Sequence, residues 1–250
     1  MKKSTAKLLS LTALFLLPFW AAKAEVSTGG LPETGEKMGS EPLIVDVSQW
    51  QNPDEMDYGV LASQIDLAIV RVQKGGYMED IHYHAHIENF QRYGVPVNVY
   101  AFCLADDEDA ARGEAQMFYE RTKNYNIATY WIDIEWDVAE DTAGTIEAYR
   151  QELKRLAGEK TKVGVYLQDD LYDIFSIDTR PFDGVWTALY DYKDDGSTHP
   201  HYTGKIPYAF SDMHQFSENG HLNGYDGYLD FSRLTQSRGR GIEYFGYKQH

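Results

Sequence analysis

The chain of 250 residues has a single cysteine, few basic residues and only one long apolar run. Cys103 has no partner for an intrachain disulfide, so stability must come from a core built by the 43% of residues that are hydrophobic. The 23 basic residues are outnumbered by 39 acidic ones, which gives a net charge of −16. This balance argues against nucleic acid, anionic membrane and an anionic cell wall as electrostatic partners.

The one long apolar run lies at the start of the chain. A basic opening, MKKSTAK, precedes about fifteen mostly apolar residues and small residues on either side of Lys23. The run is short for the roughly 20 residues of a spanning helix. We therefore interpret residues 1–24 as a secretory signal peptide, with an uncleaved anchor as the alternative. They carry four lysines and no acid, so cleavage moves the net charge from −16 to −20.

Residues 25–40 are rich in Gly, Ser, Thr and Glu and are typical of a flexible leader. Within them, residues 31–35 read LPETG, the letters of a sortase sorting signal. Such a signal precedes an apolar stretch and a basic tail, and neither follows here. We expect residues 41–250 to form one secreted domain that has no contact with a membrane after signal cleavage.

Beyond residue 40, short β-rich runs alternate with helical patterns. The predicted strands are 43–47, 67–72, 96–102, 128–134, 162–167, 184–190, 212–216 and 228–231. The first five are nearly continuous in apolar residues, as parallel strands buried on both faces are. Apolar residues at helical spacing predict helices within 107–123 and 145–157.

About eight strands and about five helices in alternation predict an α/β fold, an irregular TIM-like barrel. An open doubly wound sheet is the alternative. No Gly-rich phosphate-binding motif supports this alternative, because KGG at 74–76 is too short a signal.

The stretch TYWIDIEW (129–136) places two acids inside an apolar run. Asp133 and Glu135 share one face of a strand, near the end where barrels of this class carry their chemistry. Asp46 ends the first strand and Asp230 lies in the last, so a closed barrel would gather four carboxylates. Pattern alone leaves three roles open for them: acid/base catalysis, metal binding, or structural ion pairing.

Several segments occur in a recognisable order and spacing: DVSQWQ (46–51), GVPVNVYAF (94–102), YWIDIE (130–135), VWTALY (185–190) and MHQFSENGHLNGYDGYLDFSRL (213–234). They resemble the motifs of glycoside hydrolase family 25, the N-acetylmuramidase-type lysozymes. The resemblance covers about residues 43 to 234, and no single segment is decisive by itself. It implies a peptidoglycan hydrolase that works as a monomer in the cell-wall space, on glycan strands, without a cofactor or metal.

The resemblance also implies roles for the acids. Glu135 matches the proposed general acid and Asp133 the carboxylate beside it, while Asp46 and Asp230 match the other active-site acids. Asp226 is an alternative to Asp230, but it precedes the matching position. The expected reaction cleaves the β-1,4 bond between N-acetylmuramic acid and N-acetylglucosamine. Asp133 would attack the anomeric carbon directly or steady the substrate's own N-acetyl group.

Aromatic residues near strand ends are expected to line the sugar-binding groove. The predicted substrate-binding residues are Tyr100, Tyr166, Trp186, Tyr190 and Gln51, although each ring could also serve only as core. Two rival functions remain open: a barrel that binds wall glycan without cutting it, and a hydrolase directed at chitin.

Some residues depart from the family pattern or fall outside it. Ser232 stands where the family often has Asn, and RVQKGG (71–76) replaces a more usual K-A-T-E-G. His82 and His86 have the four-residue spacing of metal ligands on a helix, but no HExxH motif or cysteine partner accompanies them, which favours a solvated or capping role. Cys103 lies in an apolar run, which favours an inert buried thiol.

Overall fold

The computed structural model describes residues 41–168 and 171–246. The predicted signal peptide (1–24) and the predicted leader (25–40), with its LPETG segment, lie outside these residues. Among the helices that the structure describes, none has the length and apolar character needed to cross a membrane.

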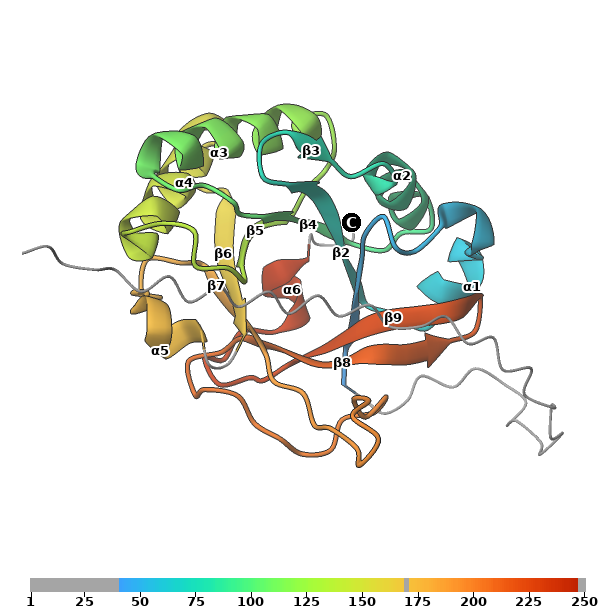
Figure 1. The fold of residues 1–250 in the computed structure, drawn as a ribbon. Helices are drawn as coiled ribbons and strands as arrows, with labels where there is room; N and C mark the ends of the chain where they lie inside the picture. The colour runs from blue at the N-terminus through green and yellow to red at the C-terminus, as the bar shows by residue number, and fades with distance from the viewer. Residues whose placement is uncertain (1–40, 169–170, 247–250) are drawn as a thin grey trace, which may run out of the picture. The chain divides into compact units, whose positions relative to one another are not determined.

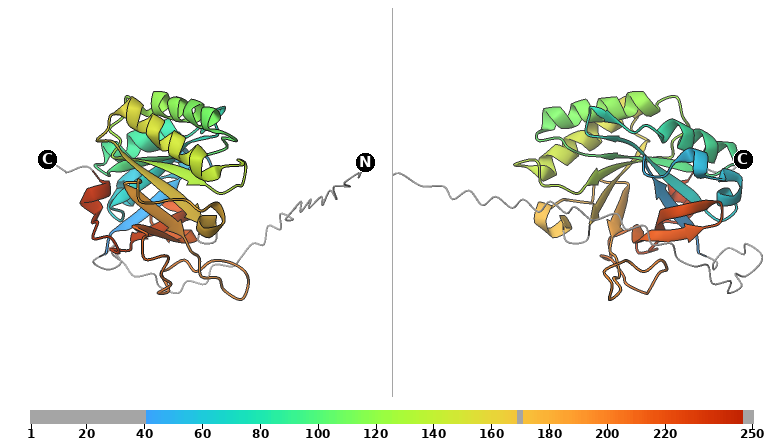
Figure 2. Two further views of the ribbon diagram at one scale, coloured as in Figure 1. Left: turned by 90° about the vertical axis from the view of Figure 1, so that its left-hand side faces the viewer. Right: turned by 45° about the vertical axis from the view of Figure 1, so that its right-hand side comes forward.

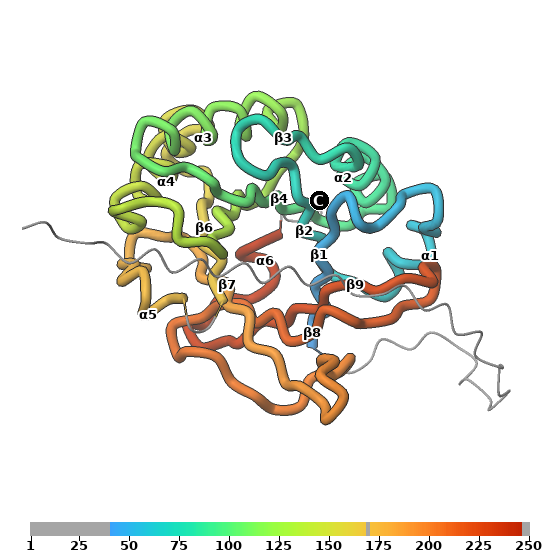
Figure 3. The backbone as a smooth tube through the Cα atoms, viewed as in Figure 1, coloured from blue at the N-terminus to red at the C-terminus, as the bar shows by residue number. Residues whose placement is uncertain are grey.

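One sheet contains all the named strands of the described residues. These are β1 (Leu43–Val47), β2 (Leu67–Lys74), β3 (Met78–Glu79), β4 (Val97–Phe102), β5 (Thr129–Ile134), β6 (Lys162–Gln168), β7 (Gly184–Ala188), β8 (Met213–Leu222) and β9 (Tyr225–Leu234). Their order is β1-β9-β8-β7-β6-β5-β4-β2-β3, and β1 also pairs with β2. The eight longer strands therefore close into a barrel, and the two-residue β3 pairs antiparallel with the end of β2 (Figures 1 and 3). The predicted TIM-like barrel is confirmed.

Strand direction differs from the prediction at one place. The pairings from β1 through β2, β4, β5, β6 and β7 to β8 are parallel, whereas β9 runs antiparallel to both β8 and β1. Asn223 and Gly224 join β8 to β9, and Gly224 has φ +94°. Asn-Gly between two strands is a strong hairpin signal, because such tight turns need positive φ. This hairpin makes both strands ten residues long, well beyond the predicted 212–216 and 228–231.

Six α-helices accompany the barrel within the described residues, close to the predicted five. They are α1 (Tyr58–Ala62), α2 (Tyr83–Arg92), α3 (Glu108–Thr122), α4 (Thr142–Ala157), α5 (Leu171–Phe175) and α6 (Ile242–Phe245), and a 3-10 helix spans Pro53–Glu55. The two longest, α3 and α4, lie side by side on the outside of the barrel (Figure 2). The Asp107 and Asp141 side chains cap their first turns by accepting backbone N–H groups of Ala110 and Gly144.

The barrel interior is filled mainly by large aromatic side chains. Trp131 on β5 is fully buried and packs against Trp186 and against Phe245 of α6. Gly164 on β6 and Gly184 on β7 make room for it, since a Cβ at either position would lie 2.3 Å or 2.6 Å from the Trp131 ring. The four acids of the predicted site lie beyond this interior, at the end of the barrel where the parallel strands finish.

A second core lies between the strands and the outer helices. Two residues that the sequence analysis considered for chemical roles, Cys103 and His86, are buried in or beside it. Cys103 is 4% exposed, and burial raises the pKa of its thiol, as expected for an inert cysteine. His86 on α2 is fully buried, so a solvated or capping role is wrong for it. Its Nε2–H donates to the Ser48 carbonyl (3.2 Å), and its Nδ1 accepts from the Tyr58 hydroxyl (2.7 Å).

Burial also lowers the pKa of His86 to about 4, so the ring is neutral at physiological pH. Its two ring nitrogens are already used by Ser48 and Tyr58. His82 is half-buried at the start of α2, and its side chain makes no capping hydrogen bond. No group of three or more potential metal ligands occurs among residues 41–168 and 171–246.

Candidate active site

A pocket of about 340 Å³ opens where the parallel strands end. All nine residues predicted for the site line it, namely Asp46, Asp133, Glu135, Asp230, Tyr100, Tyr166, Trp186, Tyr190 and Gln51. Closure of the barrel brings them together, because β1, β4, β5, β6 and β9 each contribute at least one of them to the same end. The spatial gathering of the four acids that the sequence predicted is therefore present.

Asp46 and Asp230 form one carboxyl pair, directly opposite each other where β1 meets β9. Asp46 is 4% exposed, and the two carboxyl groups are hydrogen-bonded. Burial and the charge of Asp230 raise the pKa of Asp46 well above its usual range. Burial raises the pKa of Asp230 to about 7, helped by Glu218 and Glu135, while the hydrogen bond with Asp46 acts in the opposite direction.

Asp133 and Glu135 form the second pair, on β5 and just beyond its end. Asp133 is 3% exposed, and its Oδ1 has no hydrogen-bond partner within the described part of the chain. Burial raises the pKa of both carboxyls, and the charge of Glu135 raises that of Asp133 further. Glu135 is less buried than Asp133 and lies nearer the solvent. The charge of Glu135 therefore opposes ionisation of Asp133, as expected for two carboxyl groups that share one site.

Two cations lie beside this second pair. Arg71 makes an ion pair with the buried Asp80, 2.9 Å from Nε to Oδ2. Lys74 lies over the rings of Phe102 and Trp136, with its Nζ 4.6 Å and 4.0 Å from their centroids. Both cations lower the pKa of Asp133 and Glu135, against the effect of burial.

Trp136 follows Glu135 directly but does not cover the pocket. Its ring is 50% exposed, packs edge-on against Phe102 and is absent from the pocket lining. It holds Lys74 in place by a cation–π contact.

Gln215 on β8 connects the first pair to the predicted tyrosines. Its Oε1 accepts hydrogen bonds from the hydroxyls of Tyr166 (2.7 Å) and Tyr190 (2.6 Å). Its Nε2 donates to Oδ2 of Asp46 at 2.9 Å. Tyr166 and Tyr190 therefore line the pocket with hydroxyls that are already engaged by the protein.

Trp186 and Tyr100 form part of the pocket wall nearest the barrel interior. Trp186 is only 2% exposed, and its Nε1–H donates to Oγ of Ser232 at 3.0 Å. Its ring meets the rings of Tyr166 and Tyr100 edge-on, at centroid distances of 4.5 Å and 6.3 Å. Ser232, which departs from the family's usual Asn, thus has a defined structural partner.

Gln51 holds the loop after β1 against the pocket. Its Oε1 accepts the Ser48 backbone N–H (2.9 Å), and its Nε2 donates to the Tyr228 carbonyl (3.2 Å). Asp80 fixes the same loop by accepting the Gln49 backbone N–H at 2.8 Å. The neighbouring Trp50 is 75% exposed and lines the pocket, so its ring is available to a ligand.

Sequence reasoning missed five residues of the lining: Ser48, Trp50, Gln168, Gln215 and Glu218. Ser48 lies two residues after Asp46, and Gln168 two after Tyr166, so strand alternation could have found both. Gln215 lies within a segment that supported the family resemblance. Glu218 follows a register shift in β8, which breaks the alternation and leaves no sequence signal.

Asp226, the alternative to Asp230, is exposed and lines a different pocket, of about 620 Å³. Residues of the β1–α1 connection and of the β8–β9 turn form this second pocket, among them Asp54, Tyr58 and Gly224. Of the two candidates, only Asp230 joins the other three acids.

The model of glycosyl hydrolases family 25 matches residues 45–225 of this chain. This chain belongs to glycosyl hydrolases family 25. Membership makes the protein a glycoside hydrolase, and the matched region contains all the site residues except Asp230. A search of curated proteins found no match.

Several solved structures share the fold. A glycosyl hydrolase 25 of Streptococcus pneumoniae, described as a virulence factor in host cell invasion, is 27% identical, with a TM-score of 0.71 over 83% of this chain and 94% of that one. The catalytic domain of an endolysin from a bacteriophage of Listeria monocytogenes is 20% identical, with a TM-score of 0.67 over 80% and 95%. The bacterial lysozyme of Streptomyces coelicolor is 16% identical, with a TM-score of 0.60 over 82% and 97%.

Proposed function

We propose that this family 25 hydrolase is a peptidoglycan muramidase, which cleaves the β-1,4 bond between N-acetylmuramic acid and N-acetylglucosamine. The observation that carries the proposal is the meeting of Asp46, Asp133, Glu135 and Asp230 around one pocket. The similarity to a bacterial lysozyme and to an endolysin domain supports peptidoglycan as the substrate.

The acid pair on β5 suits the two charges that glycoside cleavage requires. The leaving oxygen needs a proton, and the oxocarbenium-like sugar needs a nearby negative charge. Glu135 is the less buried of the pair and would give its proton to the leaving oxygen. Positive charge that develops on the sugar then favours the ionised form of Asp133, whose Oδ1 has no hydrogen bond within the described chain. Direct attack by Asp133 and assistance to the N-acetyl group are both compatible with this arrangement.

The rest of the pocket would bind the sugar rings. Trp50 offers an exposed face, and Tyr100, Tyr166 and Tyr190 contribute ring edges and hydroxyls along the wall. Trp186 and Gln51 would act mainly by shaping this wall and its loop. No step of the reaction requires a metal or a cofactor.

We further propose that the protein is exported, loses residues 1–24 and acts as a monomer in the cell-wall space. The basic start and the apolar run of residues 1–24 support export. An acidic chain gains little from general attraction to an anionic wall, so recognition would depend on the pocket itself.

Replacement of the acid tests the proposal. Glu135→Gln should lower the release of muramic reducing ends from a wall suspension by about 10²- to 10⁴-fold, the usual loss when a general acid is removed. Asp226→Asn is the matched control, because it also replaces a carboxylate by its amide, and Asp226 is an exposed acid that lies outside the pocket. It should keep wild-type activity.

Each alternative gives a distinct result in the same assay. Binding of the wild-type protein to walls without release of reducing ends would identify a glycan-binding barrel. Faster release from chitin than from peptidoglycan would identify a chitin-directed hydrolase. Full activity of Glu135→Gln would remove Glu135 from its role.

A further inference from the structure

The side chain of Gln215 lies at the centre of a polar network on the β1/β9 side of the pocket. It is 3% exposed and accepts hydrogen bonds from the hydroxyls of Tyr166 and Tyr190, which also contact each other. Its amide nitrogen donates to Oδ2 of Asp46 at 2.9 Å. The network connects β6, the end of β7, β8 and β1.

The two tyrosines determine which way the amide faces. Both hydroxyls donate to Oε1, which leaves the amide nitrogen on the side of Asp46. An amide NH₂ group donates and does not accept. Oδ2 of Asp46 is therefore held as an acceptor, which leaves the contact with the Asp230 carboxyl as a place for a proton on this acid pair.

We propose that Gln215 is a positioning residue that keeps one shared proton between Asp46 and Asp230, so that the pair presents a single negative charge to the bound glycan. This inference rests on the proposed function of the pocket. A second negative charge on the pair would lie among other carboxylates, and a fully neutral pair would give no electrostatic support to a cationic sugar.

The ionisable groups around the pair come from every neighbouring strand. They are Asp133, Glu135, Glu218, Tyr100, Tyr166 and Tyr190. Arg71 on β2 is engaged in an ion pair with Asp80. Burial and the acids raise the pKa of Asp46, whereas the hydrogen bond from Gln215 lowers it. Gln215 is thus the neutral donor that opposes complete protonation of the pair.

Titration of the aspartate side-chain carboxyl carbons by NMR tests this role on the intact protein without substrate. Gln215→Met keeps a similar volume but removes the donor, so the Asp46 midpoint should rise by about one pH unit. Gln215→Glu is isosteric and can donate only while its own carboxyl is protonated. Its activity on peptidoglycan should therefore survive at acidic pH, with the alkaline limb of kcat/KM about one pH unit lower than in the wild type.

Tyr190→Phe is the matched control for the titration, because Tyr166 still donates to Oε1 and keeps the amide in place. Its Asp46 midpoint should stay close to the wild-type value. An equal midpoint in Gln215→Met and Tyr190→Phe would mean that Gln215 only fills space. If Gln215→Met loses its fold by circular dichroism, Gln215→Glu is titrated in its place, and an Asp46 midpoint equal to that of the wild type overturns the proposal.

The outcomes also separate this inference from the proposed function. The titration needs no turnover, so it can support or overturn the role of Gln215 even if the wild-type protein releases no reducing ends. Absence of such release would overturn only the muramidase proposal.

Discussion

Each carboxyl pair of the pocket joins a buried acid to a partly exposed one, but the two pairs lie in different electrostatic surroundings. Asp133 and Glu135 have Arg71 and Lys74 beside them, and both cations lower their pKa. Asp46 and Asp230 face Glu218 and the neutral side chain of Gln215 instead. In the first pair the cations oppose the effect of burial on the pKa, whereas in the second pair the opposing contact of Asp46 is the neutral Gln215 side chain. Residue type alone does not assign these roles; the neighbours do.

The largest expected effect comes from breaking the interior that supports both pairs. In Gly164→Ala the new methyl group would lie 2.3 Å from the Trp131 ring, so the ring or β6 must move. Overpacking of this kind costs about 1–3 kcal/mol of the free energy of unfolding or more. Urea denaturation measures it.

Gly113→Ala on α3 is the matched control for this change. A Cβ there meets nothing within 4 Å, and alanine in a helix should stabilise the protein by about 0.5–1 kcal/mol. A loss of stability in both variants would contradict the specific contact with Trp131.

A smaller effect on the free energy of unfolding is expected from Asp230→Asn, which removes one of the two carboxyl groups where β1 meets β9. The folded-state pKa of about 7 lies above the unfolded value near 4, so this carboxyl favours folding at low pH and loses that contribution as the pH rises through 7. The Asn variant should be more stable than the wild type by about 2 kcal/mol at pH 7.5, less than the full shift implies because Asp46 shares the proton. Urea denaturation at pH 4 and pH 7.5 checks the sign.

The gain should fall to about 0.5 kcal/mol or less at pH 4, where the wild-type carboxyl is protonated in the folded state and about half protonated in the unfolded state. Asp178→Asn serves as the control, because exposed Asp178 has its pKa lowered to about 2 by hydrogen bonds to Arg180 and gives no such gain at pH 7.5. A gain of the same size at both pH values would show that proton binding is not its cause.

The smallest effect concerns the β5 pair. Lys74→Met removes a cation that lowers the pKa of Asp133 and Glu135, so their proton should be lost at higher pH. The alkaline limb of kcat/KM should move up by about half to one pH unit. A pH–rate profile on wall fragments measures this shift.

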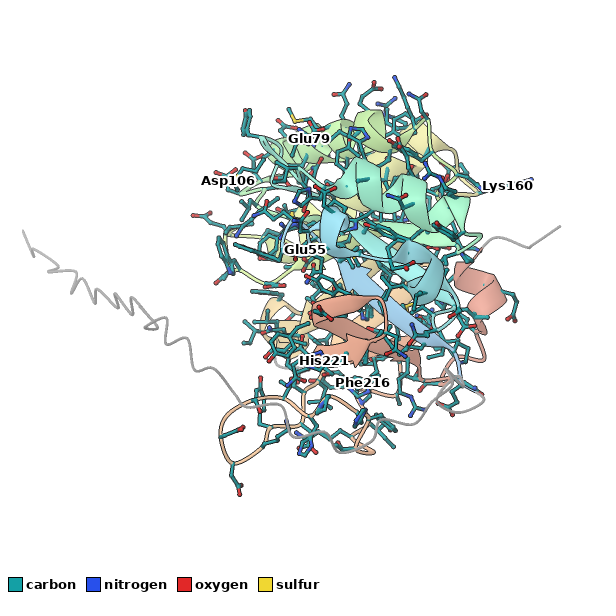
Figure 4. The ribbon with its side chains drawn as sticks, turned by 90° about the vertical axis from the view of Figure 1, so that its right-hand side faces the viewer. Glu55, Glu79, Asp106, Lys160, Phe216 and His221 are labelled. Atoms are coloured by element: carbon teal, nitrogen blue, oxygen red, sulfur yellow. The ribbon has the colours of Figure 1, made fainter. Side chains whose placement is uncertain are left out.

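Lys160→Met provides the control, since Lys160 lies just before the start of β6, whereas the pocket lies where the strands end. Figure 4 shows Lys160 on the opposite side of the fold from Asp106, which follows the end of β4. It lowers the positive charge by the same amount and should leave the profile unchanged. Equal shifts in both variants would attribute the effect to net charge rather than to the position of Lys74.

Much of the barrel could be predicted because each strand carries its own local signal. The predicted strand 43–47 coincides with β1, and the predictions for β4, β5 and β6 differ from the structure by one residue at most. These strands are buried on both faces, so their apolar runs end where burial ends. The antiparallel direction of β9 was missed, although Asn223 and Gly224 mark the hairpin.

The part of the candidate site that could be predicted also carries a local sequence signal. Asp133 and Glu135 are conspicuous because acids are rare in an apolar run. Strand positions added Asp46 and Asp230, and the family resemblance then implied a role for each acid. Glu218 is one exposed acid among many in an acidic chain, and it reaches the pocket only through the irregular register of β8. His86 looked like a surface histidine because its burial depends on Tyr58 and Ser48, which are distant in sequence.

The sequence by itself determined which residues form strands, which acids interrupt them and which family the motifs resemble, since periodicity and spacing are local properties of the chain. Only the tertiary structure decided which neighbours each acid has: Gln215 for Asp46, Lys74 beside Glu135, and Glu218 near Asp230. Desolvation and Coulomb interactions depend on distances through space, and closure of the barrel sets those distances between residues far apart in the chain.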